Sequence, residues 1–370
     1  MAQVWQRGHG DAKRAMQGWQ TGCAGQLRHT SQRLARVGHR GSKRVRSGRR
    51  ENIGSIYSSL TRPFPVPSPF MPAPQTPPTI DPVAISRWQR VAPLSSPWLH
   101  EEVAGRMLER LQWIKLQPRV WAHWGALRGG LKAHAALSRK YPDAACFVVE
   151  AHRERAQAAI KKIAKAWWNP RGWGSAATRF SVPPPGSVDM LWANMALHES
   201  ADPQALLGSW HEALKVDGFL MFSCLGPDTA RELRDVYAAR GWPPAAHELT
   251  DMHDWGDMLL QTGFAEPVMD MERITLTYDT PARLLSELRE VGRNFHHARF
   301  PALRGRVWKA TLLKALEQHL VKNEDGRFSL TFEVIYGHAL KAAPKIRVSA
   351  LSAVSVADMR SMLRGGRPVR

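Results

Sequence analysis

Short apolar runs alternate with segments of helical period along residues 96–340. The apolar runs are rich in Val, Trp, Phe and Leu, which is typical of strands buried on both faces. They lie at 119–124, 145–150, 187–192, 218–223, 266–278 and 328–338. The helical segments lie at 98–114, 131–140, 151–166, 202–213, 229–237, 251–262, 281–291 and 307–319. This alternation predicts an α/β fold with a mainly parallel sheet and helices on both faces.

A glycine-rich turn follows the first predicted strand, and an acid ends the second. Gly125, Gly129 and Gly130 stand between the strand and the next helix, and Glu150 comes directly after the second strand. Glycines let a backbone approach a ligand, and an acid in this place accepts hydrogen bonds from ribose hydroxyls. The alternatives are a plain strand-to-helix turn for the glycines and pairing with a helix N-terminus for Glu150.

Two polar residues follow the strand at 187–192. Asn194 should lie at the carboxyl edge of the sheet, where ligands of such folds bind. A residue that forms the turn there is the equal alternative. We interpret His198 as a packed or exposed histidine at the start of a helix rather than as a general base.

Charge is spread unevenly along the 370 residues. Lys and Arg number 52 against 32 Asp and Glu, and residues 1–70 hold thirteen of the basic residues but only two acids. No apolar run is long enough for a membrane span, and the first 30 residues lack the apolar stretch of a secretory signal. The three cysteines stand far apart, which argues against a disulfide framework or a zinc site. We expect a cytoplasmic protein that contains no metal and does not associate with membranes.

Residues 1–83 are basic and then proline-rich, with nine prolines from Pro63 to Pro82. We predict a disordered extension with a polyproline-like spacer. It is open whether this extension is native or the protein starts at Met71, and whether it is an inert tail, a transit peptide or a nucleic-acid-binding arm. Nucleic acid is disfavoured because no aromatic stacking pattern or nucleic-acid-binding motif accompanies the arginines. Residues 344–370 form a second basic, weakly patterned tail.

Several strings carry a resemblance to a known family. They are Val188-Asp-Met-Leu-Trp-Ala-Asn-Met-Ala-Leu-His198, Leu225-Gly-Pro-Asp-Thr229, Pro267-Val-Met-Asp-Met-Glu272 and Phe332-Glu-Val-Ile-Tyr-Gly-His338. The chain resembles the class I S-adenosylmethionine-dependent methyltransferases, and among them the malonyl-acyl-carrier-protein O-methyltransferases of biotin synthesis. The Gly-Pro-Asp-Thr and Met-Asp-Met-Glu segments are typical of that subgroup.

The resemblance implies a fold, a cofactor and a substrate. The fold is a Rossmann-like sheet of seven strands, six parallel and the last antiparallel. N-terminal helices at 84–118 precede a methyltransferase domain at 119–343, with a helical insertion at 279–327 before the last strand. The cofactor is S-adenosylmethionine, and the implied acceptor is the free carboxylate of malonyl-acyl carrier protein, or a small carboxylate. The residues expected at the cofactor are His123, Gly125, Gly129, Gly130, Glu150 and Asn194.

The glycine loop departs from the family pattern. The family has an acid before its glycines, whereas His123 or Trp124 stands there in this chain. Loss of a charge-assisted contact of about 1.5–3 kcal/mol weakens cofactor binding, and an inward Arg128 adds repulsion. An acid restored at 123 or 124 should then strengthen binding. The family's N-terminal Tyr is also missing, which leaves Trp88 or Trp98 to fill its space.

Four arginines stand in the insertion before the last strand. They are Arg293, Arg299, Arg304 and Arg306. A basic rim would steer an acidic acyl carrier protein, and a solvated charged loop is the equal alternative. Methylation of a carboxylate needs no strong general base, so no catalytic residue is predicted. The alternative function is a catalytically degenerate methyltransferase-fold protein that binds an acidic partner; a nucleic-acid methyltransferase ranks third.

Overall fold

The computed structural model describes residues 80–163 and 177–343. The expectations for most of the basic, proline-rich extension and for the C-terminal tail lie outside these residues.

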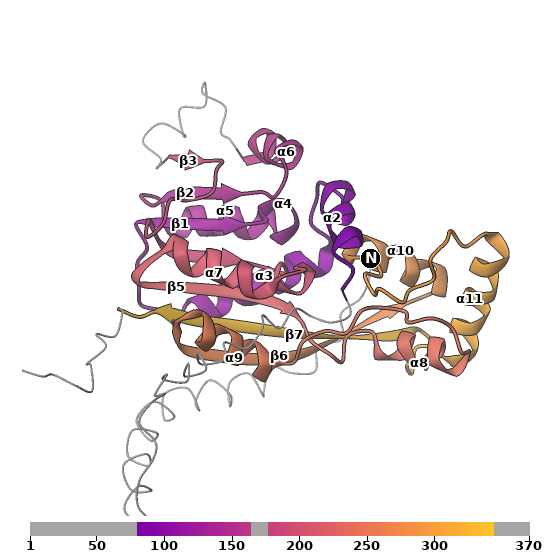
Figure 1. The fold of residues 1–370 in the computed structure, drawn as a ribbon. Helices are drawn as coiled ribbons and strands as arrows, with labels where there is room; N and C mark the ends of the chain where they lie inside the picture. Colours follow the sequence, from indigo (N-terminus) through magenta and orange to yellow (C-terminus); the bar gives the residue numbers. More distant parts are fainter. Residues whose placement is uncertain (1–79, 164–176, 344–370) are drawn as a thin grey trace, which may run out of the picture.

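Seven strands form one mixed sheet within the described residues (Figure 1). They are β1 (Val120–Trp124), β2 (Ala145–Val149), β3 (Thr178–Arg179), β4 (Val188–Ala193), β5 (Leu214–Leu225), β6 (Phe264–Tyr278) and β7 (Phe328–Lys341). Their order is β3-β2-β1-β4-β5-β7-β6. Strand β7 is antiparallel to both of its neighbours, and the other described pairings are parallel. The predicted mixed sheet with an antiparallel last strand is confirmed.

Helices cover both faces of the sheet. They are α2 (Pro82–Val91), α3 (Trp98–Leu111), α4 (Ala126–Gly129), α5 (Leu131–Lys140), α6 (Arg153–Ile163), α7 (Pro203–Ala213), α8 (Arg231–Ala239), α9 (Met252–Thr262), α10 (Pro281–Val291) and α11 (Arg306–His319), with a 3-10 turn at Leu197–Glu199. Neighbouring side chains of a strand point to opposite faces. Trp121 of β1 therefore belongs to the core beneath α3 and α5, whereas Ala122 belongs to the core beneath α7 and α9.

Strands β6 and β7 extend well beyond the carboxyl ends of the other strands (Figure 1). Their pairing continues to Tyr278 and Phe328, and the chain between them forms α10 and α11. Helix α11 also contacts α8, which follows β5. The long pair thus carries a second layer of helices beside the carboxyl edge of the sheet, as expected for a helical insertion before the last strand.

Strand β7 passes so close to β5 that only a glycine fits at one position. A Cβ atom on Gly337 would overlap the ring of Phe222, its partner across the pairing. We expect Gly337→Ala to lower the free energy of unfolding by about 1–3 kcal/mol, the usual cost of overpacking. Urea denaturation measures this. Gly208→Ala in α7, where a Cβ meets no atom within 4 Å, is the control and should be neutral or stabilising. An equal loss in both variants would contradict the packing argument.

Candidate active site

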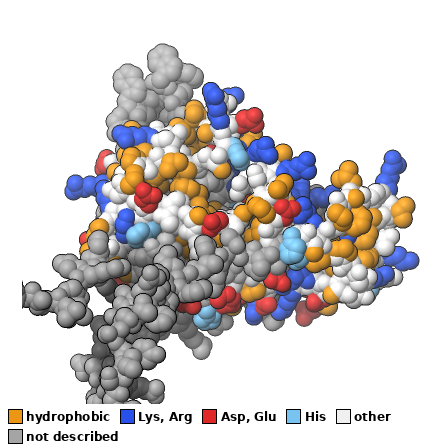
Figure 2. All heavy atoms as spheres, viewed as in Figure 1, with side chains coloured by type: hydrophobic (Ala, Val, Ile, Leu, Met, Phe, Trp, Pro, Cys, Tyr) orange, Lys and Arg blue, Asp and Glu red, His pale blue; other side chains and the backbone are white. Residues whose placement is uncertain are grey.

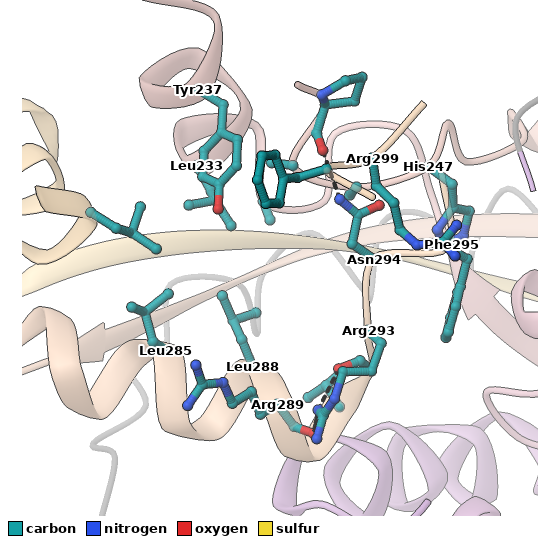
Figure 3. A pocket seen from close by; sticks show the side chains of 18 of the residues that line it. Leu233, Tyr237, His247, Leu285, Leu288, Arg289, Arg293, Asn294, Phe295 and Arg299 are labelled. Atoms are coloured by element: carbon teal, nitrogen blue, oxygen red, sulfur yellow. Dashed lines mark hydrogen bonds between the residues drawn. The ribbon is translucent and has the colours of Figure 1, made fainter. Parts of the chain in front are cut away.

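A cavity of about 730 Å³ lies beyond the carboxyl ends of β4 and β5. Leu233 and Tyr237 of α8 face Leu285 and Leu288 of α10 across it (Figure 3). Its inner end is lined by the turn after β4, which includes Glu199. The volume lies within the range of small-molecule binding sites, about 300–1,000 Å³. The cavity is thus an apolar chamber between the sheet and the insertion.

The four arginines predicted to bind a partner all line this cavity. Arg304 stacks over the ring of Trp308 at 3.6 Å, and Arg299 forms an ion pair of 2.7 Å with Asp81. Figure 2 shows basic side chains gathered near α2 and α10, with apolar ones toward α11. The structure therefore places the arginines on one rim; their role toward a partner stays a prediction.

The Gly-Pro-Asp-Thr segment contributes Thr229 to the cavity lining. The Asp228 N–H donates to Oε2 of Glu333 on β7 at 2.6 Å, and the Thr229 hydroxyl donates to the Glu333 carbonyl at 3.1 Å. A Cβ on Gly226 would lie 2.9 Å from that glutamate side chain. The segment thus fixes the start of α8 against β7, and it places Thr229 at the cavity.

The three loop glycines differ in which atoms surround the place where a side chain would stand. Gly125 has the left-handed φ of 69°, and a Cβ there would meet no atom within 4 Å. A Cβ on Gly129 would lie 3.2 Å from Nε2 of His123, and one on Gly130 would lie 3.2 Å from Cβ of Ala104 in α3. Open space therefore lies only where a side chain of Gly125 would stand. At Gly129 and Gly130 the missing side chain lets other segments of the chain pack closely against the backbone.

Glu150 ends β2 as predicted, but its carboxylate is engaged inside the protein. Oε1 accepts the N–H of Leu127 at 2.8 Å, and Oε2 lies 3.4 Å from Nε of Arg155. Arg155 also donates to the carbonyl of Ala92, just after α2. The Glu150 side chain is 3% exposed, and burial raises its pKa. The expected ribose acceptor is therefore covered from the side of α2.

Asn194 uses all of its polar atoms within the fold. Its amide donates to the carbonyls of His100 at 2.8 Å and Gly129 at 2.6 Å, and its Oδ1 accepts the hydroxyl of Ser223 at 2.6 Å. These bonds join α3, the glycine loop and β5 beside the end of β4. In this arrangement Asn194 holds the loop in place.

The position of the family's acid is taken by two residues that pack away from the opening. His123 is fully buried and stacks on His134, with ring centroids 5.4 Å apart and the two Nδ1 atoms at 3.2 Å. Burial lowers the pKa of both rings, that of His134 to about 4. Trp124 lies edge-on to Trp210 on the other face of the sheet.

A cluster of three side chains that was not predicted from the sequence lies between the loop and the cavity. The Arg128 cluster comprises Arg128, Trp88 and Glu199. The Trp88 indole N–H donates to Oε1 of Glu199 at 3.1 Å, and the guanidinium of Arg128 lies 3.9 Å from the same oxygen. Trp88 is 3% exposed and Trp98 is 44% exposed, so Trp88 is the tryptophan of this region that points inward. Glu199 carried no signal in the sequence beyond its place after β4.

Several curated proteins similar to this chain carry the name malonyl-[acyl-carrier protein] O-methyltransferase. That of Gallionella capsiferriformans is 38% identical over 254 residues, which cover 67% of this chain and 86% of that protein. Those of Nitrosospira multiformis and Methylovorus sp. are each 33% identical, over 280 and 266 residues, covering 70% and 71% of this chain and 89% and 88% of those proteins. The chain belongs to this methyltransferase family.

No protein-family profile matches the chain. Among solved structures, the YcgJ protein of Bacillus subtilis matches with a TM-score of 0.44 and 16% identity, over 66% of this chain and 99% of that one.

Members of the O-methyltransferase family depend on S-adenosylmethionine, so this is the cofactor that membership implies. The side chains around the loop do not fit it as they are arranged. Gly129 and Gly130 face the chain's own atoms, both Glu150 oxygens have internal partners, and so do the polar atoms of Asn194. Of the three loop glycines, only Gly125 has open space where a Cβ atom would stand.

Residues 80–163 and 177–343 contain no group of three or more His, Cys, Asp or Glu placed to hold a metal ion. None of the helices in that part of the chain is both long and apolar enough to cross a membrane.

The buried histidine pair predicts a pH dependence. His134 is neutral in the folded protein down to about pH 4, whereas in the unfolded chain it takes up a proton below about pH 6.5. The unfolded state thus binds more protons, and stability is lost as the pH falls through this window. Between pH 7 and 5 we expect wild type to lose about 2 kcal/mol more unfolding free energy than His134→Gln. Urea titrations at both pH values measure this, with pH 8 as the control. Parallel losses would refute it.

Proposed function

We propose that the chain esterifies the free carboxylate of a malonyl thioester carried by an acyl carrier protein, in the synthesis of biotin. The observation that carries this proposal is the apolar cavity with its arginine rim, at the carboxyl edge of a methyltransferase sheet. The names of the relatives state this substrate for them. The chain's membership in their family supports the same acceptor.

The cavity suits an extended thioester with a charged end. Its walls are largely aliphatic and aromatic, and the exposed side chains of Arg289 and Arg293, at the end of α10 and just after it, add positive charge to its lining. A carboxylate is already anionic, so the protein needs no general base; it has to align the acceptor and exclude water. His198, which lines the cavity, fits this view, because burial keeps its pKa well below the ordinary value and its Nδ1 is paired with the N–H of Leu225.

The rim supports an acidic partner. Arg306 and Arg304 lie at the start of α11, close to the exposed Leu303 at the cavity mouth. An acyl carrier protein is strongly acidic, and complementary charge accelerates such encounters and orients them. Apolar contacts beside the charges would then guide the attached acyl group toward the opening.

The glycine loop supports a second candidate function. The groups around the glycine loop are engaged by other parts of the chain. This favours a catalytically degenerate relative that keeps the fold and the basic cavity and binds the acidic partner without transferring a methyl group. The two functions differ in whether an ester forms.

The decisive assay incubates the full chain with malonyl-acyl carrier protein and S-adenosylmethionine and follows the mass of the carrier. We expect a methyl ester to appear. Leu288→Trp, which fills the cavity, should reduce the rate at least ten-fold, whereas Leu260→Trp on the exposed side of α9 should not. Absence of ester with a folded protein that still binds the carrier would favour the degenerate relative.

The rim gives a separate prediction for binding. Arg306→Glu should weaken the affinity for malonyl-acyl carrier protein about ten-fold at low salt, mainly through slower association. The loss should shrink as salt is added, because exposed charges are screened. Surface plasmon resonance at two ionic strengths measures both. Arg139→Glu on the exposed side of α5, outside the cavity lining, is the matched control. Equal losses of affinity in the two variants would contradict binding of the carrier at the arginine rim.

A further inference from the structure

The side chain of Arg128 leaves the glycine loop and ends in a seat made by three other segments. Its two terminal nitrogens donate to the carbonyls of Glu290 at 2.7 Å and Val291 at 2.6 Å. Its guanidinium lies 5.2 Å from the ring centre of Trp88 and 3.9 Å from Oε1 of Glu199. Glu199 and Val291 also line the cavity, so the seat lies where the loop meets the cavity.

Every component of this seat favours a cation. An aromatic face, a carboxylate and the carbonyls at a helix C-terminus all carry negative charge or potential. The Glu199 side chain is only 14% exposed; burial raises its pKa, and Arg128 and the Trp88 indole N–H act in the opposite direction. A cation in the seat therefore keeps a buried carboxylate ionised.

Arg128 occupies the seat imperfectly. Its Nε is buried and has no hydrogen-bond partner among the described residues. Burial lowers its pKa, and the neighbouring cations Arg155 and Arg293 lower it further. Arg293 also stacks on Trp88, at 4.7 Å from the ring centre. The seat thus holds one cation close to two others, and part of that cation is unpaired.

We propose that the seat is a binding site for a small organic cation, of the sulfonium or alkylammonium class, and that Arg128 occupies it as an internal competitor. This rests on the proposed function, since the family's cofactor is the sulfonium that would use it. It also explains why the glycine loop is closed: the loop's own arginine satisfies the groups that the ligand would otherwise satisfy. Cofactor affinity is then limited by the displacement of Arg128.

The first test is a rescue of folding stability and needs no enzyme activity. Arg128→Ala should lower the Tm, because Glu199 then lacks its cation. Millimolar trimethylsulfonium should raise the Tm of Arg128→Ala by several degrees but leave wild type unchanged. The double variant Arg128→Ala/Glu199→Gln should not respond. A rise that is equal in all three proteins, or absent in Arg128→Ala, overturns the proposal.

Two further variants guard against failure to fold. Arg128→Gln keeps a polar side chain without the charge and should also respond to trimethylsulfonium, whereas Arg128→Lys keeps the cation and should not. Arg139→Ala, on the exposed side of α5, controls for the loss of any arginine. The same response in Arg128→Lys as in Arg128→Gln would show that the seat does not select charge.

The second test is calorimetric titration with S-adenosylmethionine and with methylthioadenosine, a neutral thioether. Arg128→Ala should bind S-adenosylmethionine at least ten-fold more tightly than wild type does, which corresponds to about 1.4 kcal/mol. Methylthioadenosine should gain much less. Equal gains for both ligands, or none, would overturn the role of the seat. A chain that forms no methyl ester yet shows both responses would refute the proposed function and keep this inference.

Discussion

The close contact of α3 with the glycine loop determines the arrangement of the whole carboxyl edge. Both carboxylate oxygens of Glu101 accept the first N–H groups of α5, at 3.1 Å from Leu131 and 3.3 Å from Lys132. Gly130 is needed because Ala104 packs directly against it. A helix N-terminus that lacks a side-chain cap of its own is thus satisfied by another helix. With the loop held from this side, its remaining side chain, Arg128, is directed toward α10.

This constraint links the two halves of the site. The cavity belongs to the insertion, which the long β6 and β7 pair holds beyond the sheet, whereas the loop belongs to the first strands. Arg128 joins them by bonding the last carbonyls of α10. Helix α2 closes the same region from above, since its Trp88 and Gln89 both donate to Glu199. The cavity is thus open, whereas the glycine loop beside it is closed by contacts within the chain.

The sequence predicted the elements that carry long apolar patterns and missed those that do not. Strands β1, β2, β4, β6 and β7 lie within a few residues of their expected ranges. Strand β3 has two exposed residues and shows no period, so it was not predicted. Most of helix α2 falls within the range 84–118 expected for the N-terminal helices, but no start was predicted for it. The Asp81-Pro82 start of α2 was the available signal, because Asp81 caps the helix. The partners of Arg128 and Glu150 were beyond reach, since such contacts depend on how distant segments pack.

The missing acid of the glycine loop is therefore part of a larger substitution. An aspartate at 123 would stand fully buried beside His134, and one at 124 would replace the contact between Trp124 and Trp210. Neither position faces the space before Gly125, so the expectation that an acid there restores cofactor binding does not suit this geometry. Carboxylates from other segments lie near the loop instead, those of Glu101, Glu150 and Glu199, and Glu199 forms an ion pair with Arg128. The carboxylate that pairs with the loop's arginine thus follows β4 rather than β1, and both partners belong to the same chain.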